Sequence, residues 1–516
     1  MSSIKFFYII LSLVPAISAS KILAIVSTPS YSHQISFQRI WISLAQKGHQ
    51  VTLLTTNPIN DPNLKTLREI NTNSSYEIVH EYLDKVRDLP ESQIVRFIAR
   101  SLDEIMEQQL SLDPVVNLIR NESDYDVVIC ESLFFEMQAF ADLYKCPKIL
   151  ISSFQPFNFH FQFLGSPSSP AANPSTELGF IGGVDTSFSN RFSSFVMSVL
   201  YTSIKHFVHF PQRHDLLKKH FGPNVRSPLE ILRDTDLFII TSNHILNEIR
   251  PLGPNIVHLG GGLHLSPPKP LPKEIKEFLD SATEGFIYLS LGTNAKSMYL
   301  PNEEIQVIME AFSELPYKVL WKLERQDILQ IPKNVKIMSW IPQQDVLRHP
   351  NIKLFIMQGG LQSLEESILT HVPMVIMPGW MPDQVVNSRR MEHRGLARII
   401  HHHPIPDKEE FKSVILDVIN DPKYKENVVK TAELLLDQPM SAVDKAVWWI
   451  EYVIRHKGAK HLRIPSIDMP AYQFYCLDII AVIIILVFIS IWIFKKICSF
   501  IFQLFLMLIF SKKKRE

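Results

Sequence analysis

Apolar and polar positions follow a repeating strand and helix pattern along the first half of the chain. Residues 21–26 form an apolar, β-branched run, residues 34–47 repeat their apolar positions at helical spacing, and residues 50–55 form a second strand-like run. Such a series of strand, helix and strand is the unit of a parallel α/β sheet. Further apolar runs, separated by helical stretches, extend this sheet at residues 127–130, 148–152 and 237–241.

The second half repeats this pattern after a proline-rich segment. Residues 265–272 read LSPPKPLP, a composition typical of a stiff linker between domains. We therefore predict an N-terminal domain at residues 20–263, a linker at 264–274 and a C-terminal domain at 275–460, each doubly wound. Apolar runs predict the strands of the second domain at residues 286–291, 318–323, 335–338, 353–357 and 374–378.

Both ends of the chain carry apolar runs of a different kind. Residues 1–19 combine a basic start, an apolar run and small residues, which predicts a signal peptide. Residues 477–494 are almost purely apolar and are followed by Lys495 and Lys496, which predicts one transmembrane helix. By the positive-inside rule, residues 495–516 are then a cytoplasmic tail, and the body is lumenal in a single-pass type I topology.

The tail and two sequons add detail to this topology. A second apolar run at residues 497–510 is short for a span, and we expect it to lie in the membrane interface or to re-enter the membrane. Lys513 and Lys514 stand four and three places from the carboxyl end, the spacing of a dilysine signal that coat proteins read, and predict the endoplasmic reticulum membrane. Asn73 and Asn121 begin sequons and are candidate N-glycosylation sites.

Composition and charge exclude several classes of protein. The chain has 516 residues, of which 46% are hydrophobic and 20% charged, so it is neither disordered nor fibrous. Lys and Arg number 52, as do Asp and Glu, and this balance argues against a nucleic-acid partner. Only 4 cysteines occur, so a disulfide scaffold is excluded, although a bridge between Cys130 and Cys146 stays open. No His and Cys cluster has zinc spacing, and we expect no metal.

The loop after the run at 353–357 has the chemistry of a phosphate site. No G-x-G-x-x-G motif follows the first strand and no G-x-x-x-x-G-K motif occurs. The phosphate-binding motifs of dinucleotide-binding and P-loop proteins are therefore missing from the sequence. Gln358 and Gly360 instead lie where a strand ends and a helix begins, and the unpaired N–H groups of a helix start suit a phosphate. Further along that helix, Ser363 can add a hydroxyl, and Glu366 can accept hydrogen bonds from ribose.

Neighbouring loops at the same sheet edge offer groups for a sugar and a base. Asp383 and Gln384 form an acid and amide pair suited to sugar hydroxyls, although a helix cap is the structural alternative. Trp340 can stack on a base, or equally be a buried core residue. The remaining candidates at this edge are Gln343, Ser290 and Thr293.

A long stretch beginning at Trp340 resembles the signature of the UDP-glucuronosyltransferase and UDP-glycosyltransferase family. It reads WIPQQDVLRHPNIKLFIMQGGLQSLEESILTHVPMVIMPGWMPDQVVN, and the likeness extends to GGLHLSPPKPLPKEIKEFL at residues 261–279, to SLGT at 290–293 and to the membrane tail. The resemblance implies a GT-B fold, in which two Rossmann-like domains face a cleft. The C-terminal domain would bind the UDP-sugar co-substrate, and the N-terminal domain the acceptor.

The same resemblance assigns roles to the candidate donor residues. It implies that Trp340 stacks on uracil, Gln343 contacts the nucleoside, Glu366 holds the ribose, and Asp383 with Gln384 holds the sugar. It places around the diphosphate Ser290, Gln358 and Ser363, with Lys322 as a cationic helper. Many members of the family have His at the position of Gln358, and an uncharged amide weakens the grip on the nucleotide. Invertebrate-type members resemble this chain there and typically prefer UDP-glucose.

His33 and Glu131 are the candidate catalytic pair. His33 opens the first helix at the loop after the first strand, where an imidazole can act as general base. Glu131 ends a strand at the same edge and can hold the far ring nitrogen, although the family usually has Asp there. The aromatic-rich residues 154–163 and the Pro/Ser loop at 166–175 predict an apolar acceptor site, unless these phenylalanines are simply core.

Together these features predict an inverting, metal-independent hexosyltransferase. It would move glucose, with glucuronic acid as the alternative, from a UDP-sugar to a hydroxyl of a small lipophilic acceptor, giving a β-glycoside in a detoxification or conjugation reaction. Two other classes stay open: a family-like binding protein without catalysis, and a glycosyltransferase that acts on membrane lipids. The sequence also leaves the oligomeric state open.

Overall fold

The computed structural model describes residues 19–86, 91–121, 123–167, 169, 172–173, 187–292, 300–325, 328, 330–379, 382–401 and 407–513. Residues 1–463 form one compact unit, and residues 464–516 form a second. All but the last residue of the predicted signal peptide lies outside the described residues, as do Thr293 and Lys514.

The first sheet consists of seven parallel strands, in the spatial order β3 (Leu67–Asn71), β2 (Gln50–Thr55), β1 (Lys21–Val26), β4 (Val127–Glu131), β5 (Lys148–Ser152), β6 (Leu237–Ile240) and β7 (Ile256–His258). We call this sheet and its helices the amino-terminal lobe. The inner strands β4 and β5 are buried along their whole length, as in a parallel sheet that is covered on both faces.

Alternate residues of β1 pack into two different cores. Ile22 and Val26 belong to the core under α2 (Tyr31–Gln46), while Leu23 and Ile25 belong to the core on the opposite face. The other helices of this lobe are α3 (Ser75–Val86), α4 (Glu91–Leu110), α5 (Asp113–Arg120), α6 (Ala139–Tyr144), α7 (Asn158–Phe163), α8 (Phe188–Ile204), α9 (Phe210–Phe221) and α10 (Pro228–Arg233).

The second sheet consists of six parallel strands, in the order β10 (Val335–Met338), β9 (Lys318–Lys322), β8 (Phe286–Ser290), β11 (Ile352–Met357), β12 (Met374–Ile376) and β13 (Ala397–Ile399). We call it, with its helices, the carboxyl-terminal lobe. Its helices are α11 (Lys273–Asp280), α12 (Asn302–Ser313), α13 (Gln343–Leu347), α14 (Leu361–Leu369), α15 (Pro382–His393), α16 (Lys408–Asn420) and α17 (Pro422–Leu436). Two parallel α/β sheets confirm the predicted fold class.

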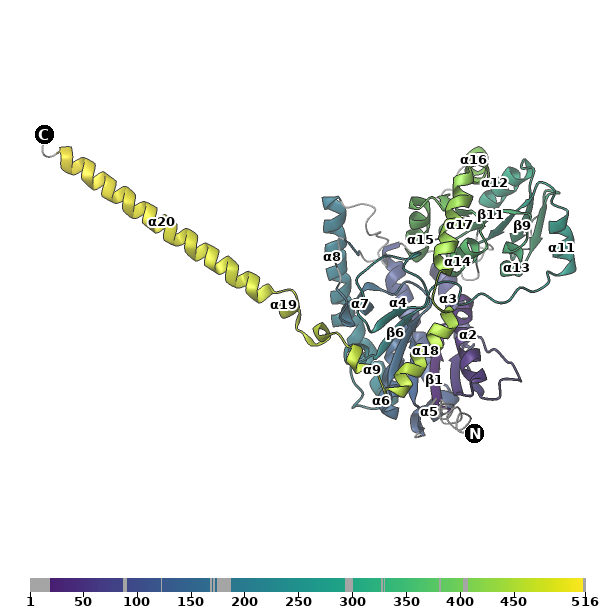
Figure 1. The fold of residues 1–516 in the computed structure, drawn as a ribbon, viewed down its shortest axis with the longest axis horizontal. Coiled ribbons are helices and arrows are strands. Elements are labelled where there is room, and N and C mark those ends of the chain that lie inside the picture. The colour runs from purple at the N-terminus through teal and green to yellow at the C-terminus, as the bar shows by residue number, and fades with distance from the viewer. Residues whose placement is uncertain are drawn as a thin grey trace, which may run out of the picture. The chain divides into compact units, whose positions relative to one another are not determined.

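The helix α18 (Ala442–Arg455) returns to the amino-terminal lobe, beside α2 (Figure 1). Its apolar face, which includes Val447 and Ile450, packs into the same core as Ile22 and Trp41. The predicted C-terminal domain range contains this helix, whereas the structure packs it on the other lobe. The chain therefore crosses between the lobes twice, once through the proline-rich linker and once before α18.

The proline-rich linker is hydrogen-bonded along much of its length. The Ser266 N–H donates to Gln344 Oε1 at 2.9 Å, and the Lys269 N–H donates to Asp345 Oδ1 at 2.9 Å. From the amino-terminal lobe, the Arg39 guanidinium donates to the Leu265 carbonyl at 2.8 Å. The linker thus lies against α13 and contacts both lobes.

Residues 464–516 contain the short helix α19 (Ala471–Phe474) and one long helix, α20 (Leu477–Lys513), drawn in yellow in Figure 1. The stretch Leu477–Leu508 has 32 residues and includes an 18-residue window with a mean hydropathy of 3.0, enough to cross a membrane. The second apolar run, expected as a separate interfacial or re-entrant piece, instead continues this helix through Lys495 and Lys496. Lysines do not break a helix, because their long side chains retain helical rotamers.

Two smaller expectations concern single side chains. Cys130 and Cys146 are both free thiols, so the bridge that the sequence left open is not formed in the structure. Asn73 and Asn121 are both exposed, as a glycosylation site requires.

Candidate active site

His33 and Glu131 meet at the carboxyl edge of the amino-terminal sheet. His33 lies in the first turn of α2, after the loop that follows β1, and Glu131 ends the neighbouring strand β4. The His33 Nδ1 atom lies 2.6 Å from Glu131 Oε1. Glu131 is fully buried, while 19% of the His33 side chain is exposed. An ionised carboxylate at this distance selects the tautomer that is protonated on Nδ1, which leaves Nε2 as the basic atom.

Two residues that the sequence analysis missed also bind Glu131. The Thr28 hydroxyl donates to Glu131 Oε2, and the Ser153 hydroxyl donates to Oε1 at 3.3 Å. Thr28 follows β1 and Ser153 follows β5, so both stand at the carboxyl ends of strands next to β4. That shared position is the sequence signal that could have found them. The carboxylate is therefore held from three sides, and His33 is oriented by a fixed partner.

The start of α14 has the geometry predicted for a phosphate site. The strand β11 ends at Met357, and Gly360 is the N-cap of the helix, where no side chain of the described part of the chain caps the first turn. The N–H groups of that turn are thus open to an anion. One turn further on, Glu366 lies in the same helix and is buried. The structure therefore places the predicted phosphate and ribose groups along a single helix.

Glu366 stands at the centre of a hydrogen-bond network. Gln343 Nε2 donates to Glu366 Oε2 at 2.6 Å and to the Ser363 hydroxyl at 3.0 Å. Gln344 Nε2 donates to Glu366 Oε1 at 2.9 Å, and His264 Nε2 lies 3.2 Å from the same oxygen. Burial alone would raise the pKa of Glu366, but the ion pair with His264 and the two amides hold it below its ordinary value. Gln344 and His264 were not singled out from the sequence.

Gln358 packs tightly against the loop after β8. Its Nε2 atom occupies the space where a Cβ atom on Gly292 would lie, and among the described residues its buried Oε1 atom has no hydrogen-bond partner. The Ser290 hydroxyl accepts from the Gly292 N–H at 3.4 Å. Lys322 Nζ donates to the Gly292 carbonyl at 2.8 Å and to Glu324 at 2.6 Å, so this predicted phosphate helper also fixes the loop.

Replacing Gly292 with alanine is expected to weaken donor binding. Gly292 has a φ of +83°, and an added methyl group would both strain the backbone and displace the Gln358 amide. We expect KM for the UDP-sugar to rise about tenfold and the free energy of unfolding to fall by about 1 kcal/mol. Gly48→Ala is the matched control, because Gly48 has a φ of +93° but no atom within 4 Å of the added group. An equal rise in KM in both variants would contradict this account.

Asp383 and Gln384 begin α15, on the side of the carboxyl-terminal lobe that faces His33. Gln384 Oε1 accepts from the Gly379 N–H at 3.1 Å. Asp383 is solvent-exposed; desolvation by the neighbouring protein raises the pKa of its carboxyl, and a hydrogen bond with the Gln384 backbone and the charge of His33 offset part of the rise. Asp383 is therefore within electrostatic reach of the candidate base.

Trp340 leaves much of its indole available. The side chain is 56% exposed, and the edge of the Tyr31 ring approaches it at a centroid distance of 5.8 Å. The core alternative for Trp340 is thus excluded. Tyr31 is in the first turn of α2, two residues before His33, so the indole and the candidate base face the same region.

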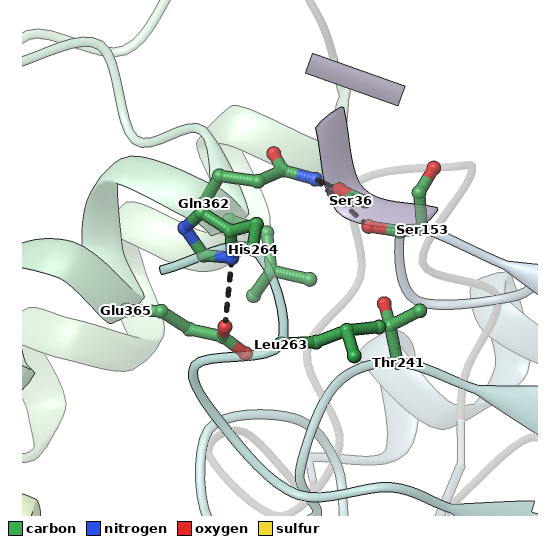
Figure 2. Close-up of a pocket in the computed structure, with 8 residues that line it drawn as sticks. Ser36, Ser153, Thr241, Leu263, His264, Gln362 and Glu365 are labelled. Atoms are coloured by element: carbon green, nitrogen blue, oxygen red, sulfur yellow. Dashed lines mark hydrogen bonds and ion pairs between the residues drawn. The ribbon is translucent and has the colours of Figure 1, made fainter. Parts of the chain in front are cut away.

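Hydrogen bonds join α14 to the surroundings of the candidate base. Gln362 Nε2, in the first turn of α14, donates to the Ser36 hydroxyl and to the Ser153 carbonyl, each at 3.0 Å. Figure 2 shows Gln362 extending toward both residues above a small pocket. Since the Ser153 hydroxyl itself binds Glu131, one residue links the start of α14 to the candidate catalytic pair. The pocket is lined by Ser36, Ser153, Thr241, Leu263, His264, Leu361, Gln362 and Glu365.

Glu365, beside this pocket, makes stability depend on pH. Burial raises its pKa to about 7, and the charge of His264 offsets only part of the rise. Because an unfolded glutamate titrates near pH 4.3, the folded state binds the proton more tightly, and the stabilising contribution present at low pH is lost as pH rises toward 7. The raised pKa of His264, where Glu366 and Glu365 outweigh the effect of burial, acts in the same direction.

Glu365→Gln should therefore stabilise the protein more at higher pH, because the amide needs no proton to remain neutral. We expect the melting temperature of the variant to exceed that of the wild type by a margin that grows between about pH 4 and pH 7 and then levels off. Thermal unfolding of the full chain in detergent measures this margin. A difference independent of pH would show that Glu365 does not titrate in this range.

Two solved structures share this two-lobed architecture. The glycosyltransferase of kitacinnamycin superposes with a TM-score of 0.57 over 84% of this chain and 98% of its own, at 17% sequence identity. The calicheamicin glycosyltransferase CalG4 superposes with a TM-score of 0.56 over 85% of this chain and 99% of its own, at 16% identity. The fold is thus that of the GT-B class of glycosyltransferases.

Sequence comparison then gives the family. The family model described as UDP-glucoronosyl and UDP-glucosyl transferase matches residues 20–515. UDP-glycosyltransferase UGT5 of Dactylopius coccus is 30% identical over 489 residues, 93% of this chain and 92% of its own length. UDP-glucuronosyltransferase 2B7 of Homo sapiens is 31% identical over 498 residues, 92% of each chain. The protein belongs to this family of UDP-glycosyltransferases and is an enzyme of that class, which confirms the resemblance seen in the sequence.

Proposed function

We propose that this enzyme transfers glucose from UDP-glucose to a hydroxyl of a small lipophilic acceptor, with inversion at the anomeric carbon. The observation that carries the proposal is the His33–Glu131 pair, which Ser153 and Gln362 link to the start of the donor helix α14. A general base and an anion-binding helix end are thereby adjacent across the two lobes. A single displacement needs both groups, one on each side of the reacting carbon.

In this mechanism His33 Nε2 takes the proton from the acceptor hydroxyl. The acceptor oxygen then forms its bond to the anomeric carbon as the bond from that carbon to the diphosphate oxygen breaks, and UDP leaves with the electron pair. Glu131 stabilises the imidazolium that forms. Because attack and departure occur on opposite faces, an α-linked donor gives a β-glycoside.

The donor side stabilises the charge of the leaving diphosphate. The open N–H groups at the start of α14 face that position, and Gln358 and Ser290 lie at the neighbouring loop ends. In this proposal Asp383 and Gln384 hold sugar hydroxyls. The negative charge of Asp383 also disfavours a sugar with its own carboxylate, which supports glucose over glucuronic acid.

The acceptor side is aromatic next to the base. The Phe154 ring lies 5.6 Å from the His33 ring and 5.5 Å from the Phe157 ring, and both phenylalanines are partly exposed. The later phenylalanines of this run, Phe159, Phe161 and Phe163, belong to the core. The aromatic run therefore divides into a core part and a part beside His33, and an apolar acceptor fits the latter.

The apolar helix α20 supports a membrane location for the enzyme. The proposed arrangement has the signal peptide removed, α20 crossing the membrane of the endoplasmic reticulum and the body in the lumen, where Asn73 and Asn121 can be glycosylated. The basic end, with Lys513 and Lys514, then faces the cytosol, where coat proteins can bind it.

UDP release from membranes that contain the full chain tests the proposal. UDP-glucose and UDP-glucuronate are each supplied with a panel of small phenols, and UDP and the glycoside are measured together. We expect release with UDP-glucose and a phenol, at least tenfold faster than with UDP-glucuronate. Faster release with UDP-glucuronate would overturn the assignment of the donor. If the transferred sugar were found only in the lipid fraction, the enzyme would instead be a lipid glycosyltransferase.

A further inference from the structure

The linker between the lobes places a buried histidine, His264, next to Glu366, the carboxylate proposed to bind the ribose. His264 is only 5% exposed and stands at the start of the proline-rich linker. Its Nε2 atom lies 3.2 Å from Glu366 Oε1, and its Nδ1 atom lies 3.6 Å from Glu365 Oε2. One imidazole is thus in ion-pair contact with two successive carboxylates of the donor helix.

The backbone around His264 is fixed from the same side. Its carbonyl oxygen accepts from Gln344 Nε2 at 3.3 Å, and the Gly262 N–H donates to Glu365 Oε2 at 3.2 Å. Gln344 also donates to Glu366 and accepts from the Ser266 N–H. The linker, α13 and α14 therefore form one hydrogen-bonded network, which fixes the position of the imidazole.

The network leaves Glu366 with a defined set of open acceptor positions. Its Oε2 atom accepts from Gln343 and its Oε1 atom accepts from Gln344, while His264 Nε2 lies 3.2 Å from Oε1 as an ion-pair partner. An ionised carboxylate has about four lone-pair sites, and the two amides fill two of them, so one site on each oxygen remains for the two ribose hydroxyls that would donate to Glu366. Without a cation behind it, a buried carboxylate would be costly to keep charged and would be held less firmly.

We propose that His264 is a positioning residue for the donor: it holds the Glu366 carboxylate in the orientation that receives the ribose hydroxyls. This inference rests on the proposed function, because it assumes that a UDP-sugar occupies the site. His264 touches no reacting atom, so its loss should weaken donor binding and leave the chemical step almost unchanged. The effect should also depend on the ribose hydroxyls themselves, since they are the groups that Glu366 would bind.

The test measures binding of UDP and of 2′,3′-dideoxy-UDP to the full-length protein in detergent, for the wild type and for His264→Ala. We expect UDP affinity to fall between about 10-fold and 100-fold in the variant, the size of a lost hydrogen bond to a charged group. Affinity for the dideoxy nucleotide should change less than about threefold, because that ligand makes no ribose contact that His264 supports. In turnover assays, KM for the donor should rise while kcat stays within about threefold.

Two further variants separate positioning from general destabilisation. His49→Ala removes another buried histidine, which lies 3.4 Å from Glu451 and has no contact with the donor site, and should leave UDP affinity unchanged. His264→Gln keeps an N–H donor near Glu366 and should recover part of the UDP affinity. Equal losses for UDP and the dideoxy nucleotide, or no loss for either, would overturn the role of His264 while the proposed function stands. Failure of the wild type to bind UDP would instead overturn the proposed function.

Discussion

Replacing His33 with alanine is expected to lower kcat between about 10²-fold and 10⁴-fold, the range that a general base contributes. The His33 Nε2 atom is the basic site left open by the bond from Nδ1 to Glu131. Without it, the acceptor hydroxyl must lose its proton to water. Donor binding should be almost unaffected, because His33 lies in α2 and the predicted UDP-binding groups lie in the other lobe.

Glycoside formation at saturating donor and acceptor measures this loss, and UDP binding is measured on the same protein preparation. His461→Ala is the matched control, since His461 is an exposed histidine that contacts Tyr452 rather than the site. The control should retain wild-type kcat. A His33→Ala protein with more than about a tenth of wild-type kcat would show that another group takes the proton.

Replacing Glu131 with glutamine should lower kcat by about 10²-fold, with KM for the donor almost unchanged. The amide has nearly the shape of the carboxylate, so the contacts with Thr28 and Ser153 can be kept in part. It carries no charge to stabilise the imidazolium, and its NH₂ group can select the opposite tautomer of His33. The variant should therefore lose turnover while its fold is retained.

Glu451→Gln provides the control for this change. Glu451 is likewise a buried glutamate beside a histidine, His49, but in the contact between α18 and the amino-terminal lobe. Its replacement should alter thermal stability and leave kcat at the wild-type value. If Glu131→Gln retained full kcat, or if both variants lost activity equally, the pairing of Glu131 with His33 would have no catalytic meaning.

The sequence predicted the long buried strands well and the short edge strands poorly. Apolar, β-branched runs such as β1 and β5 give a clear signal, because residues buried on both faces must be apolar. The sequence analysis missed β3, which reads LREIN and has one fully buried residue at the sheet edge. It also missed the three-residue strands β7 and β13, which are too short to show any period.

Some residues of the candidate site could likewise be predicted from the sequence, and others could not. His33 and Glu131 could be predicted as a pair, because each follows a strand and those strands are neighbours, and the longer arm of Glu131 still reaches the imidazole. His264 and Gln344 could not be predicted to act together. They are distant in sequence, and only the course of the linker along α13 brings them to Glu366. Contacts between remote segments leave no local period in a sequence.

The anomeric configuration of the product tests whether His33 acts as the base of an inverting displacement. Membranes with the full chain are incubated with UDP-glucose labelled in the sugar and a small phenol, and the product is isolated and treated with a β-glucosidase. If His33 is the base of an inverting displacement, we expect a labelled, water-soluble glycoside that the β-glucosidase cleaves. The His33→Ala protein should not form this product. An α-glycoside, or undiminished product from His33→Ala, would contradict an inverting displacement with His33 as the base.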